Sequence, residues 1–472
     1  MLMNSFRKTQ ILFLFATILL FSCEKFDQIS DDPNLSLSFS VDTLIFDTVF
    51  TSVGSITKRF TVHNTHSKDL KISNIKLKGG EASSYRINID GEATTNVDDV
   101  VIYSKDSLYI FARVLIDPTN SNASIIIEDE IQFTTNGNEQ EIKLLAWGQD
   151  AHFIIADQKD DGKDFKNIAG PNEDIEWTND KPYVIYGYAK IESSASLTIK
   201  KGTQIHFHNN SGLWIAKDAE LNIEGELGSE VVFQGDRLDP DYSDITNQWN
   251  EIIIEGGNSS HTINYAIIKN GRSGIILNNE VGNCNLEISN SIVSNMSEYG
   301  VLCNNSNIEG FNNILSDCGA SLLESNGNNS ITFIHSTFAN YWHHSLRAQE
   351  SIIINGDNNT IVDVYFGNSI VDGSMIEELK ISDNLNSSSQ IIFNYTSLKT
   401  RKNANDILLY NEVILNPQDL FKELNVLVLL LTEGAAVIDA GTTDLSDHFP
   451  FDLLNNDRSI APDLGAIEFI AE

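Results

Sequence analysis

The chain has 472 residues, of which 41% are hydrophobic and 21% are charged, and its formal net charge at pH 7 is −35. Phosphate binding requires a basic face, so this acidity excludes nucleic acid as an expected partner. The length predicts two or three domains, and the hydrophobic content is sufficient for a large core. The excess of carboxylates indicates either a solvated, soluble surface or the binding of divalent cations.

Residues 1–22 are predicted to form the signal peptide of a lipoprotein. Arg7 and Lys8 precede an apolar run over residues 11–21, which has the length of a signal-peptide core and is too short to span a bilayer. The sequence Leu20-Phe21-Ser22-Cys23 that follows resembles the lipobox of bacterial lipoproteins. The resemblance implies that Cys23 is acylated and anchors the mature chain in a membrane. A plain secretory signal with an incidental cysteine is the alternative.

The residues after the cysteine bear on the location of the mature chain. Glu24-Lys25-Phe26-Asp27 is similar to the segment that directs Bacteroidetes-type lipoproteins to the cell surface. The resemblance implies a protein of the cell envelope, held in the outer membrane. Exposure at the surface and retention in the periplasm both stay open.

Residues 31–155 are expected to form an immunoglobulin-like β-sandwich. Six apolar segments separated by turns indicate strands, and their spacing predicts seven strands in all. The six segments are 56–63, 70–77, 85–89, 107–116, 131–133 and 142–147. The sequence over residues 60–72 resembles the second and third strands of bacterial immunoglobulin-like domains. Such a domain between an anchor and a β-helix implies a spacer, and the polar residues 156–176 are interpreted as a linker.

Residues 177–425 are predicted to form a parallel β-helix. A short apolar segment recurs at residues 273–277, 299–303, 318–322 and 343–346, and the last residues of these copies are 26, 19 and 24 positions apart. Further apolar segments lie between them, and clusters of Asn and Gly separate the segments at the expected corners. A coil of about 22–26 residues with two or three strands is typical of a right-handed parallel β-helix.

Two stretches carry a family resemblance. Residues 182–207 resemble the opening of right-handed β-helix proteins of pectin-lyase type, and residues 437–441, 457–458 and 462–468 are similar to the end motif of bacterial surface β-helix proteins. The chain resembles a group of Bacteroidetes-type β-helix lipoproteins over roughly residues 177–470. The resemblance implies an architecture and no single activity. We expect residues 426–472 to cap the coil, with residues 426–431 as a buried strand.

The repeat also predicts which side chains face inward. In the alignment of the four copies, Cys303 and Leu346 share one inward column and His344 belongs to another. The outward positions then hold no row of carboxylates and only one basic residue, Arg347. This pattern argues against the calcium-dependent lyase chemistry of this fold on that sheet, although a slip of one residue reverses the faces.

One segment offers candidates for glycan binding or catalysis. His343 and Arg347 are candidate catalytic residues, and Tyr341, Trp342 and Trp249 are candidates for stacking on a sugar ring. The competing interpretation is that Trp342 and His344 fill the coil while His343 and Arg347 are solvated.

The remaining candidates are metal ligands. Four carboxylates in the insertion over residues 236–244 can supply oxygen ligands to calcium, namely Asp236, Asp239, Asp241 and Asp244. Their spacing is not that of an EF-hand, and a solvated acidic loop is the alternative. His206 and His208 are expected to face solvent, and three cysteines beyond Cys23 show no spacing for a zinc site. No other cofactor is expected.

Two functions are consistent with these features. The favoured hypothesis is a lipid-anchored envelope protein whose β-helix is a non-catalytic binding surface for a glycan or a surface protein. The alternative is a polysaccharide lyase or glycoside hydrolase that acts on the β-helix face. The outward side chains of each sheet decide between them.

Overall fold

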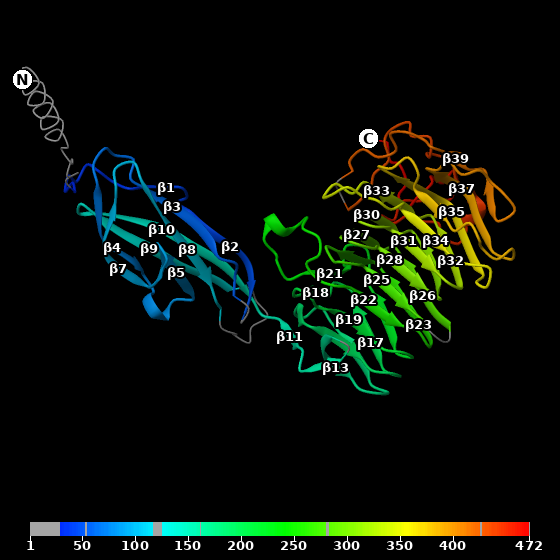
Figure 1. Cartoon of the computed structure of the whole chain (residues 1–472), viewed down its shortest axis with the longest axis horizontal. Coiled ribbons are helices and arrows are strands. Elements are labelled where there is room, and N and C mark those ends of the chain that lie inside the picture. Colours follow the sequence, from blue (N-terminus) through cyan, green and yellow to red (C-terminus); the bar gives the residue numbers. More distant parts are fainter. Residues whose placement is uncertain are drawn as a thin grey trace, which may run out of the picture. The chain divides into compact units, whose positions relative to one another are not determined.

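The computed structural model describes residues 29–51, 54–116, 125–160, 162–279, 283–424 and 427–471 (Figure 1). The predicted signal peptide, Cys23 and the segment after it lie outside these residues. The chain divides into two compact units, Met1–Gln149 and Asp150–Glu472. The helices of the described ranges are the single turns η1 (Gly80–Ala82), η2 (Pro240–Tyr242) and α2 (Thr443–Ser446), and none is long and apolar enough to cross a membrane.

The first unit is the expected immunoglobulin-like sandwich. Two five-stranded sheets, with strand orders β1-β3-β8-β5-β6 and β2-β10-β9-β4-β7, pack their apolar faces together. All strand pairs are antiparallel except β2 with β10. The strands are β1 (Ser38–Phe39), β2 (Thr43–Phe50), β3 (Lys58–His63), β4 (Leu70–Leu77), β5 (Tyr85–Ile89), β6 (Glu92–Ala93), β7 (Asn96–Ile102), β8 (Ser107–Val114), β9 (Ile125–Thr135) and β10 (Asn138–Gln149).

All six strand segments predicted in this unit are present, but the total of seven strands is wrong. The ranges described here hold ten strands, and the additional ones are β1, β2, β6 and β7. β1 and β6 have two residues each, and β7 carries two aspartates on an exposed edge, so none of the three has a recognisable apolar pattern. β2 contains enough apolar residues to be recognised as a strand, but the six predicted segments do not include it.

The second unit is a parallel β-helix, as predicted. Each complete coil has three strands, which stack on those of the next coil and build three faces. The first face comprises β14 (Asp174–Trp177), β17 (Ser196–Lys200), β20 (Glu220–Glu224), β23 (Asn258–Asn264), β26 (Asn283–Ser289), β29 (Asn307–Phe311), β32 (Asn329–Ile334), the start of β35 (Val362–Gly373), the start of β37 (Gln390–Leu398) and β38 (Leu408–Asn411).

The second face lies in the same 19-stranded sheet as the first, and the third face is a separate 10-stranded sheet. The second face comprises β11 (His152–Ile155), β15 (Tyr183–Tyr186), β18 (Gln204–Phe207), β21 (Val231–Gly235), β24 (Ala266–Lys269), β27 (Ile292–Met296), β30 (Ile314–Cys318), β33 (Thr337–Asn340), the ends of β35 and β37, and β39 (Ile414–Leu415). The third face comprises β12 (Gln158–Asp160), β13 (Lys163–Ala169), β16 (Tyr188–Ile191), β19 (Gly212–Ile215), β22 (Ile252–Glu255), β25 (Ile275–Asn278), β28 (Val301–Asn304), β31 (Leu323–Asn326), β34 (Ile352–Asn355) and β36 (Leu379–Ile381).

The predicted linker, residues 156–176, is not a linker. It contains β12 and β13 and the start of β14, and β13 pairs in parallel with β16 while β14 pairs with β17. The segment therefore forms the first coil of the β-helix. Its polar composition is compatible with this position because a terminal coil has fewer neighbours, and all three residues of β12 are exposed.

The strand register confirms part of the inward column and corrects the rest. Ile275 pairs with Val301, and Cys303 is fully buried inside the coil as predicted. Val301 pairs next with Leu323, not with Ala320. Leu323 in turn pairs with Ile352. The copies at residues 318–322 and 343–346 are therefore not equivalent strands, and short apolar runs of this kind fit several registers.

His344 and Leu346 do not face the core. Residues 341–350 form a loop between β33 and β34, where His344 is exposed and Leu346 is 100% exposed. This loop makes its coil longer than the earlier coils. A repeat of constant length, counted from the earlier copies, therefore ends in the loop and not in the next strand, β34.

One column of corners, which the sequence did not single out, contains stacked asparagines. Asn290, Asn312 and Asn368 occupy equivalent corners with φ between +44° and +55°. Asn tolerates this left-handed conformation because its side chain hydrogen bonds locally. The Asn290 amide donates to Asn264 at 2.9 Å, and Asn312 donates to Asn290 at 3.0 Å. Each corner is thus tied to the next.

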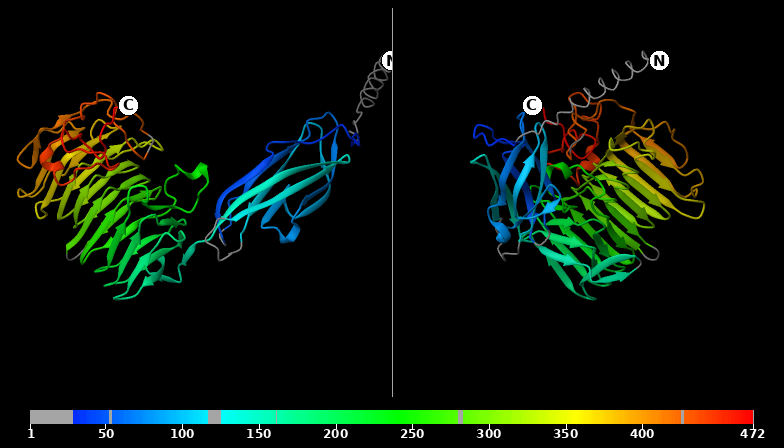
Figure 2. Two further views of the ribbon diagram at one scale, coloured as in Figure 1. Left: turned by 180° about the vertical axis from the view of Figure 1, so that it is seen from behind. Right: turned by 60° about the vertical axis from the view of Figure 1, so that its left-hand side comes forward.

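The C-terminal segment covers one side of the coil. Leu464, Ala466 and Ile467 belong to a buried cluster with Ile314 and Ile370, which point outward from the second face. Figure 2 shows this segment, in orange and red, over the later coils. The predicted end cap is therefore mainly a cover along the second face. Residues 427–431 form no strand, and Leu431 makes only an isolated bridge to Phe421.

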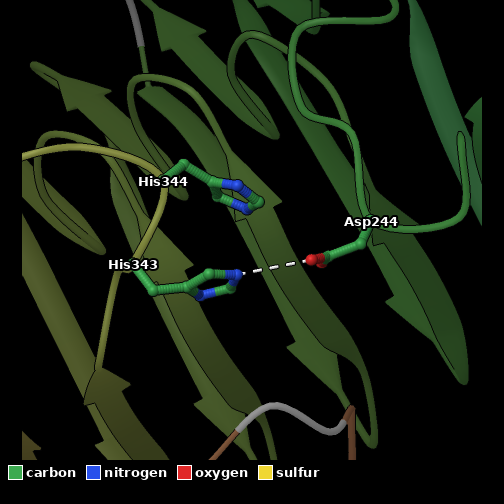
Figure 3. Close-up of side chains that lie close together, drawn as sticks. All are labelled: Asp244, His343 and His344. Atoms are coloured by element: carbon green, nitrogen blue, oxygen red, sulfur yellow. Dashed lines mark hydrogen bonds and ion pairs between the residues drawn. The ribbon is translucent and has the colours of Figure 1, made fainter. Parts of the chain in front are cut away.

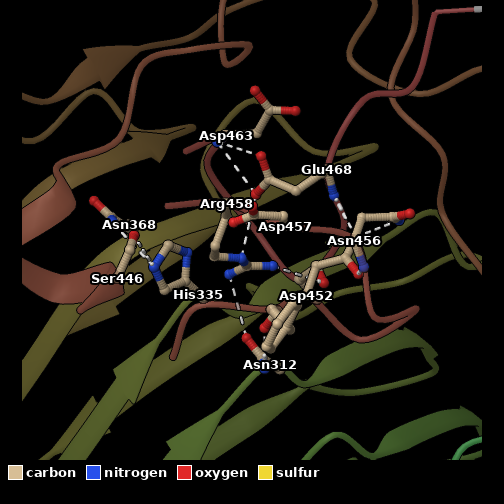
Figure 4. Close-up of polar contacts among 12 residues, drawn as sticks. Asn312, His335, Asn368, Ser446, Asp452, Asn456, Asp457, Arg458, Asp463 and Glu468 are labelled. Atoms are coloured by element: carbon tan, nitrogen blue, oxygen red, sulfur yellow. Dashed lines mark hydrogen bonds and ion pairs between the residues drawn. The ribbon is translucent and has the colours of Figure 1, made fainter. Parts of the chain in front are cut away.

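A polar network holds this cover in place (Figure 4). Arg458 is 1% exposed; its Nε lies 3.3 Å from Glu468 Oε1, and its Nη1 donates to Asn312 of the coil at 3.2 Å. The Glu468 amide donates to Asp452, and the Asp463 amide donates to Glu468. Arg458, Asp463 and Glu468 belong to the end motif, so this motif attaches the segment to the coil.

We expect three buried histidines to reduce the stability of the protein as the pH falls below about 6.5. Burial lowers the pKa of His206 and His261 to about 4 and that of His335 to about 2, whereas each titrates near 6.5 when unfolded. The unfolded chain therefore binds more protons between these values, so the stability present above pH 6.5 decreases toward pH 4. Each of the first two histidines accounts for a loss of about 2 kcal/mol in the free energy of unfolding between pH 7 and pH 5.

His261 provides the test of this dependence, because it lies inside the coil and contacts Ser259 and the Leu221 amide. Urea unfolding of His261→Gln should show a fall between pH 7 and pH 5 that is smaller by about 2 kcal/mol than that of the unmodified protein. His152→Gln, at a half-buried position, is the control and should leave the fall unchanged. An undiminished fall in His261→Gln contradicts the assignment.

Candidate functional site

A groove of about 370 Å³ lies on the second face of the coil. Its floor is formed by Lys269, Ser294 and Ser316, which follow one another in register on β24, β27 and β30. The preceding residues of these strands, Ile268, Val293 and Leu315, are buried in the core. Strand alternation therefore turns the three polar side chains outward into the groove.

The floor has unsatisfied hydrogen-bonding capacity. The hydroxyl oxygens of Ser294 and Ser316 are buried and have no hydrogen-bond partner among the residues of the described ranges. Burial lowers the pKa of the Lys269 ammonium, and no ion pair of Lys269 is found within the same ranges. A buried hydroxyl without a partner costs free energy, which a polar ligand would recover.

Three corner residues form one edge of the groove. Asn270, Asn295 and Asp317 adopt left-handed conformations, with φ of +66°, +56° and +50°. The Asp317 carboxylate accepts the Tyr341 amide at 3.2 Å, and burial raises its pKa to about 6. A carboxyl group with this pKa exchanges protons near neutral pH, which suits it to acid–base chemistry.

Two loops far apart in the sequence meet over this same edge, where Asn270 and Asn295 bond to the first loop and Asp317 bonds to the second. The insertion between β21 and β22, drawn in green in Figure 1, brings Asp244 to the groove, and the loop after β33 brings His343. The His343 Nε2 lies 3.3 Å from an oxygen of Asp244, and His344 lies beside both (Figure 3). The structure thus joins parts of two regions that the sequence offered as separate candidates.

The four aspartates predicted to bind calcium do not converge. Asp236 accepts from His208 at 2.8 Å, and Asp239 forms an ion pair with Arg237 at 3.6 Å. Asp241 is exposed on η2, and Asp244 faces His343. The predicted calcium site is therefore not assembled, because the chain reverses within the loop and turns the carboxylates in different directions.

The predicted sugar-stacking residues are largely unavailable to a ligand. Trp249 is inside the coil, 1% exposed and stacked on Phe207 at 4.5 Å. Trp342 is 8% exposed and donates to Ser345. Tyr341 is half-buried, and its hydroxyl donates to Asp372 at 2.5 Å. Trp342 is therefore buried, but it lies in the loop after β33 and outside the core cluster of the coil, so it does not fill the coil as the competing interpretation expects.

Arg347 and His206 are buried residues. The Arg347 side chain is 2% exposed and forms a two-pronged ion pair with fully buried Glu378, including a bond of 2.7 Å. It therefore holds the loop after β33 against the coil and does not reach the groove. His206 is 4% exposed, contrary to the expectation for this residue, and donates to the Gly235 carbonyl at 3.3 Å. His208 is exposed, as expected.

Sequence reasoning missed most of the groove, although a signal for its floor was present. Lys269 and Ser294 directly follow the interleaved apolar segments at 265–268 and 290–293, and Ser316 follows the one at 312–315. Aligning those segments as well would have placed the three residues in one outward row. Asp317 carried no comparable signal, because its burial depends on the loop that covers it.

Comparison with known proteins identifies no family. No family model and no curated protein matches the chain. Among solved structures, the VesB protease of Vibrio cholerae is 10% identical over 24% of this chain and 31% of its own, with a TM-score of 0.18. A PapD-like domain of human CEP192 is 9% identical over 28% and 96%, with a TM-score of 0.18. A family 123 glycoside hydrolase from Clostridium perfringens is 11% identical over 30% of both chains, also with a TM-score of 0.18. Matches at this level carry no argument about function.

We expect Arg347→Ala to lower the free energy of unfolding by about 3–5 kcal/mol, because it leaves the buried Glu378 carboxylate without its partner. Urea unfolding followed by circular dichroism measures this effect. Lys159→Ala removes an exposed ion pair with Asp164 and should cost no more than about 1 kcal/mol. A loss of similar size in both variants would contradict the structural role given to Arg347.

Proposed function

We propose that this protein is a lipid-anchored protein of the cell envelope whose β-helix binds a glycan in the groove on its second face. One observation carries the proposal: the buried hydroxyls of Ser294 and Ser316 face the groove without partners. Sugar hydroxyl groups both donate and accept hydrogen bonds, so they match this floor better than an apolar ligand does. The volume of about 370 Å³ lies within the range of ligand sites.

The ammonium of Lys269 is the feature of the groove that favours an acidic glycan, although the carboxyl groups of Asp244 and Asp317 also line it. Lys269 places a half-buried ammonium at one end of the row of serines. An ammonium in this position is stabilised by a ligand carboxylate or sulfate, since desolvation strengthens the charge interaction. The asparagine side chains of the corner add further donors and acceptors. A uronate or a sulfated sugar over Lys269 is therefore the expected ligand class.

Cleavage of the glycan is a second candidate function, and the shifted pKa values favour it. Asp317, with a pKa of about 6, and Lys269, with a lowered pKa, line the same groove as His343. Convergence of such groups is typical of catalytic sites. The missing row of carboxylates spoke against an enzyme on the third face alone. The groove lies on the second face, to which that observation does not apply.

The membrane anchor rests on the resemblance of residues 20–23 to a lipobox. We expect Cys23→Ala to move the protein from the membrane fraction to the soluble fraction and to abolish labelling by radioactive palmitate. Retention in the membrane with loss of the label would contradict lipid anchoring. Protease treatment of intact cells then distinguishes exposure at the surface from retention in the periplasm. Crosslinking on intact cells tests whether the binding partner is a surface protein.

Binding to the groove is tested with a panel of acidic and neutral polysaccharides by isothermal titration calorimetry. We expect Lys269→Met to weaken the affinity for an acidic glycan by about 10–100-fold, because hydrogen bonds to charged groups contribute about 1.5–3 kcal/mol. Lys380→Met removes an exposed lysine from the third face and is the matched control. No affinity for any glycan, or equal losses in the control, would refute the proposal.

The same samples distinguish binding from cleavage. Release of reducing ends or of unsaturated uronates that is abolished by Lys269→Met or Asp317→Asn would establish an enzyme. Binding without products under the same conditions would establish a binding protein.

A further inference from the structure

We propose that Asp244, His343 and His344 form a binding site for a divalent transition-metal ion of the zinc class. Each offers one ligand atom, and the three atoms lie within 4.8 Å of one another. It is the only group of three such residues found in the described parts of the chain. The site borders the groove, but the inference does not rest on glycan binding.

The distances fit a metal centre better than a hydrogen-bonded pair. His343 Nε2 and Asp244 Oδ2 are 3.3 Å apart, which is long for a hydrogen bond to a carboxylate. Two ligands that each lie about 2.0–2.1 Å from a tetrahedral zinc ion are roughly 3.3 Å apart. The rings of His343 and His344 lie with their centroids 4.1 Å apart, and both project toward Asp244 (Figure 3).

A buried asparagine holds two of the ligands in place. Asn295 is 8% exposed, and its amide nitrogen donates to the Asp244 carbonyl at 3.1 Å and to Asn270 at 2.9 Å. Its amide oxygen is therefore the atom that faces His344 Nε2, at 2.9 Å. His344 Nε2 must then donate, and the lone pair of His344 is left on Nδ1. Metal-binding histidines are oriented in this way by a hydrogen bond from the other ring nitrogen.

The corner column supports the loop as well. Asn270 donates to the Ser243 carbonyl at 3.0 Å, next to Asp244 in the chain. The coil thus fixes the backbone that presents the carboxylate, and both asparagines adopt left-handed conformations at the corners. A site held by the solenoid costs little conformational entropy on binding, which favours affinity.

The ligand types select the kind of ion. Two imidazoles with one carboxylate suit Zn²⁺, Ni²⁺, Cu²⁺ and Co²⁺, whereas Ca²⁺ and Mg²⁺ require six or more oxygen ligands or a water shell. Three protein ligands leave a tetrahedral ion with a fourth position, and Asp244 and His343 line the groove. An ion held there would offer this position to water or to an oxygen of a molecule in the groove.

Other histidine–aspartate pairs of the chain lack the third ligand and provide the control. His208 bonds to Asp236 at 2.8 Å, and His208 is exposed like His343. This pair has the same chemistry as the proposed site in an acidic surrounding, without a second histidine. His208→Ala therefore tests whether binding follows from any exposed histidine in an acidic protein.

The experiment uses the full chain, purified without a polyhistidine tag and stripped with a chelator. Calorimetric titration with ZnCl₂ should give one ion per chain, and His343→Ala, His344→Ala and Asp244→Asn should each weaken binding at least tenfold. His208→Ala should bind as tightly as the unmodified chain, and CaCl₂ should not compete. Circular dichroism confirms that the variants fold, which is expected because the three side chains are exposed.

A spectroscopic measurement on the unmodified chain makes the test independent of the variants. Cu²⁺ bound at the site should show hyperfine coupling to imidazole nitrogens in electron paramagnetic resonance. Absence of zinc binding, unchanged affinity in a His343→Ala/His344→Ala double variant, or a copper spectrum without nitrogen coupling would each overturn the proposal. Loss of zinc binding in His208→Ala would assign the ion to a different site.

Discussion

Backbone hydrogen bonding between successive coils is the constraint on which the second unit depends. Every strand of a complete coil pairs in parallel with its equivalent in the coils before and after it, in register over three to five residues in most pairs. Because the pairing repeats, equivalent inward residues of successive coils stack in a column, and equivalent outward residues do the same. Ile275, Val301, Leu323 and Ile352 form such a column inside the third face. One rule therefore produces both the core and the rows of surface side chains.

Because equivalent residues stack in this way, small differences between coils are enough to form a site. The second face carries a polar row, Lys269, Ser294 and Ser316, where neighbouring rows of that face point into the C-terminal cover. Insertions at the turns of two coils, after β21 and after β33, then meet at one edge of the row. Loops on a rigid scaffold tolerate variation, so the groove is located where insertion costs the stacked strands nothing.

Corner asparagines link the scaffold to these loops. Asn270 and Asn295 complete the left-handed corners of their coils and also bind the backbone of the insertion over residues 236–250. Asn312 serves the C-terminal cover in the same way through Arg458. A residue type required by the backbone at the corner thereby supplies hydrogen bonds to segments outside the coil. Two different corner columns, at the start and at the end of the strands of the second face, thus attach the cover and the loops of the groove.

The sequence alone determined the fold class, because periodic burial of short apolar strands has few physical solutions. It located six strands of the sandwich and the inward position of Cys303. Tertiary structure decided the register beyond the second repeat, because loops of unequal length shift the count and place His344 outside the coil. It also decided the site: Asp244 and His343 are 99 positions apart and meet only where stacked coils bring two insertions to one edge. Long-range proximity of this kind depends on the stacking, which no local pattern encodes.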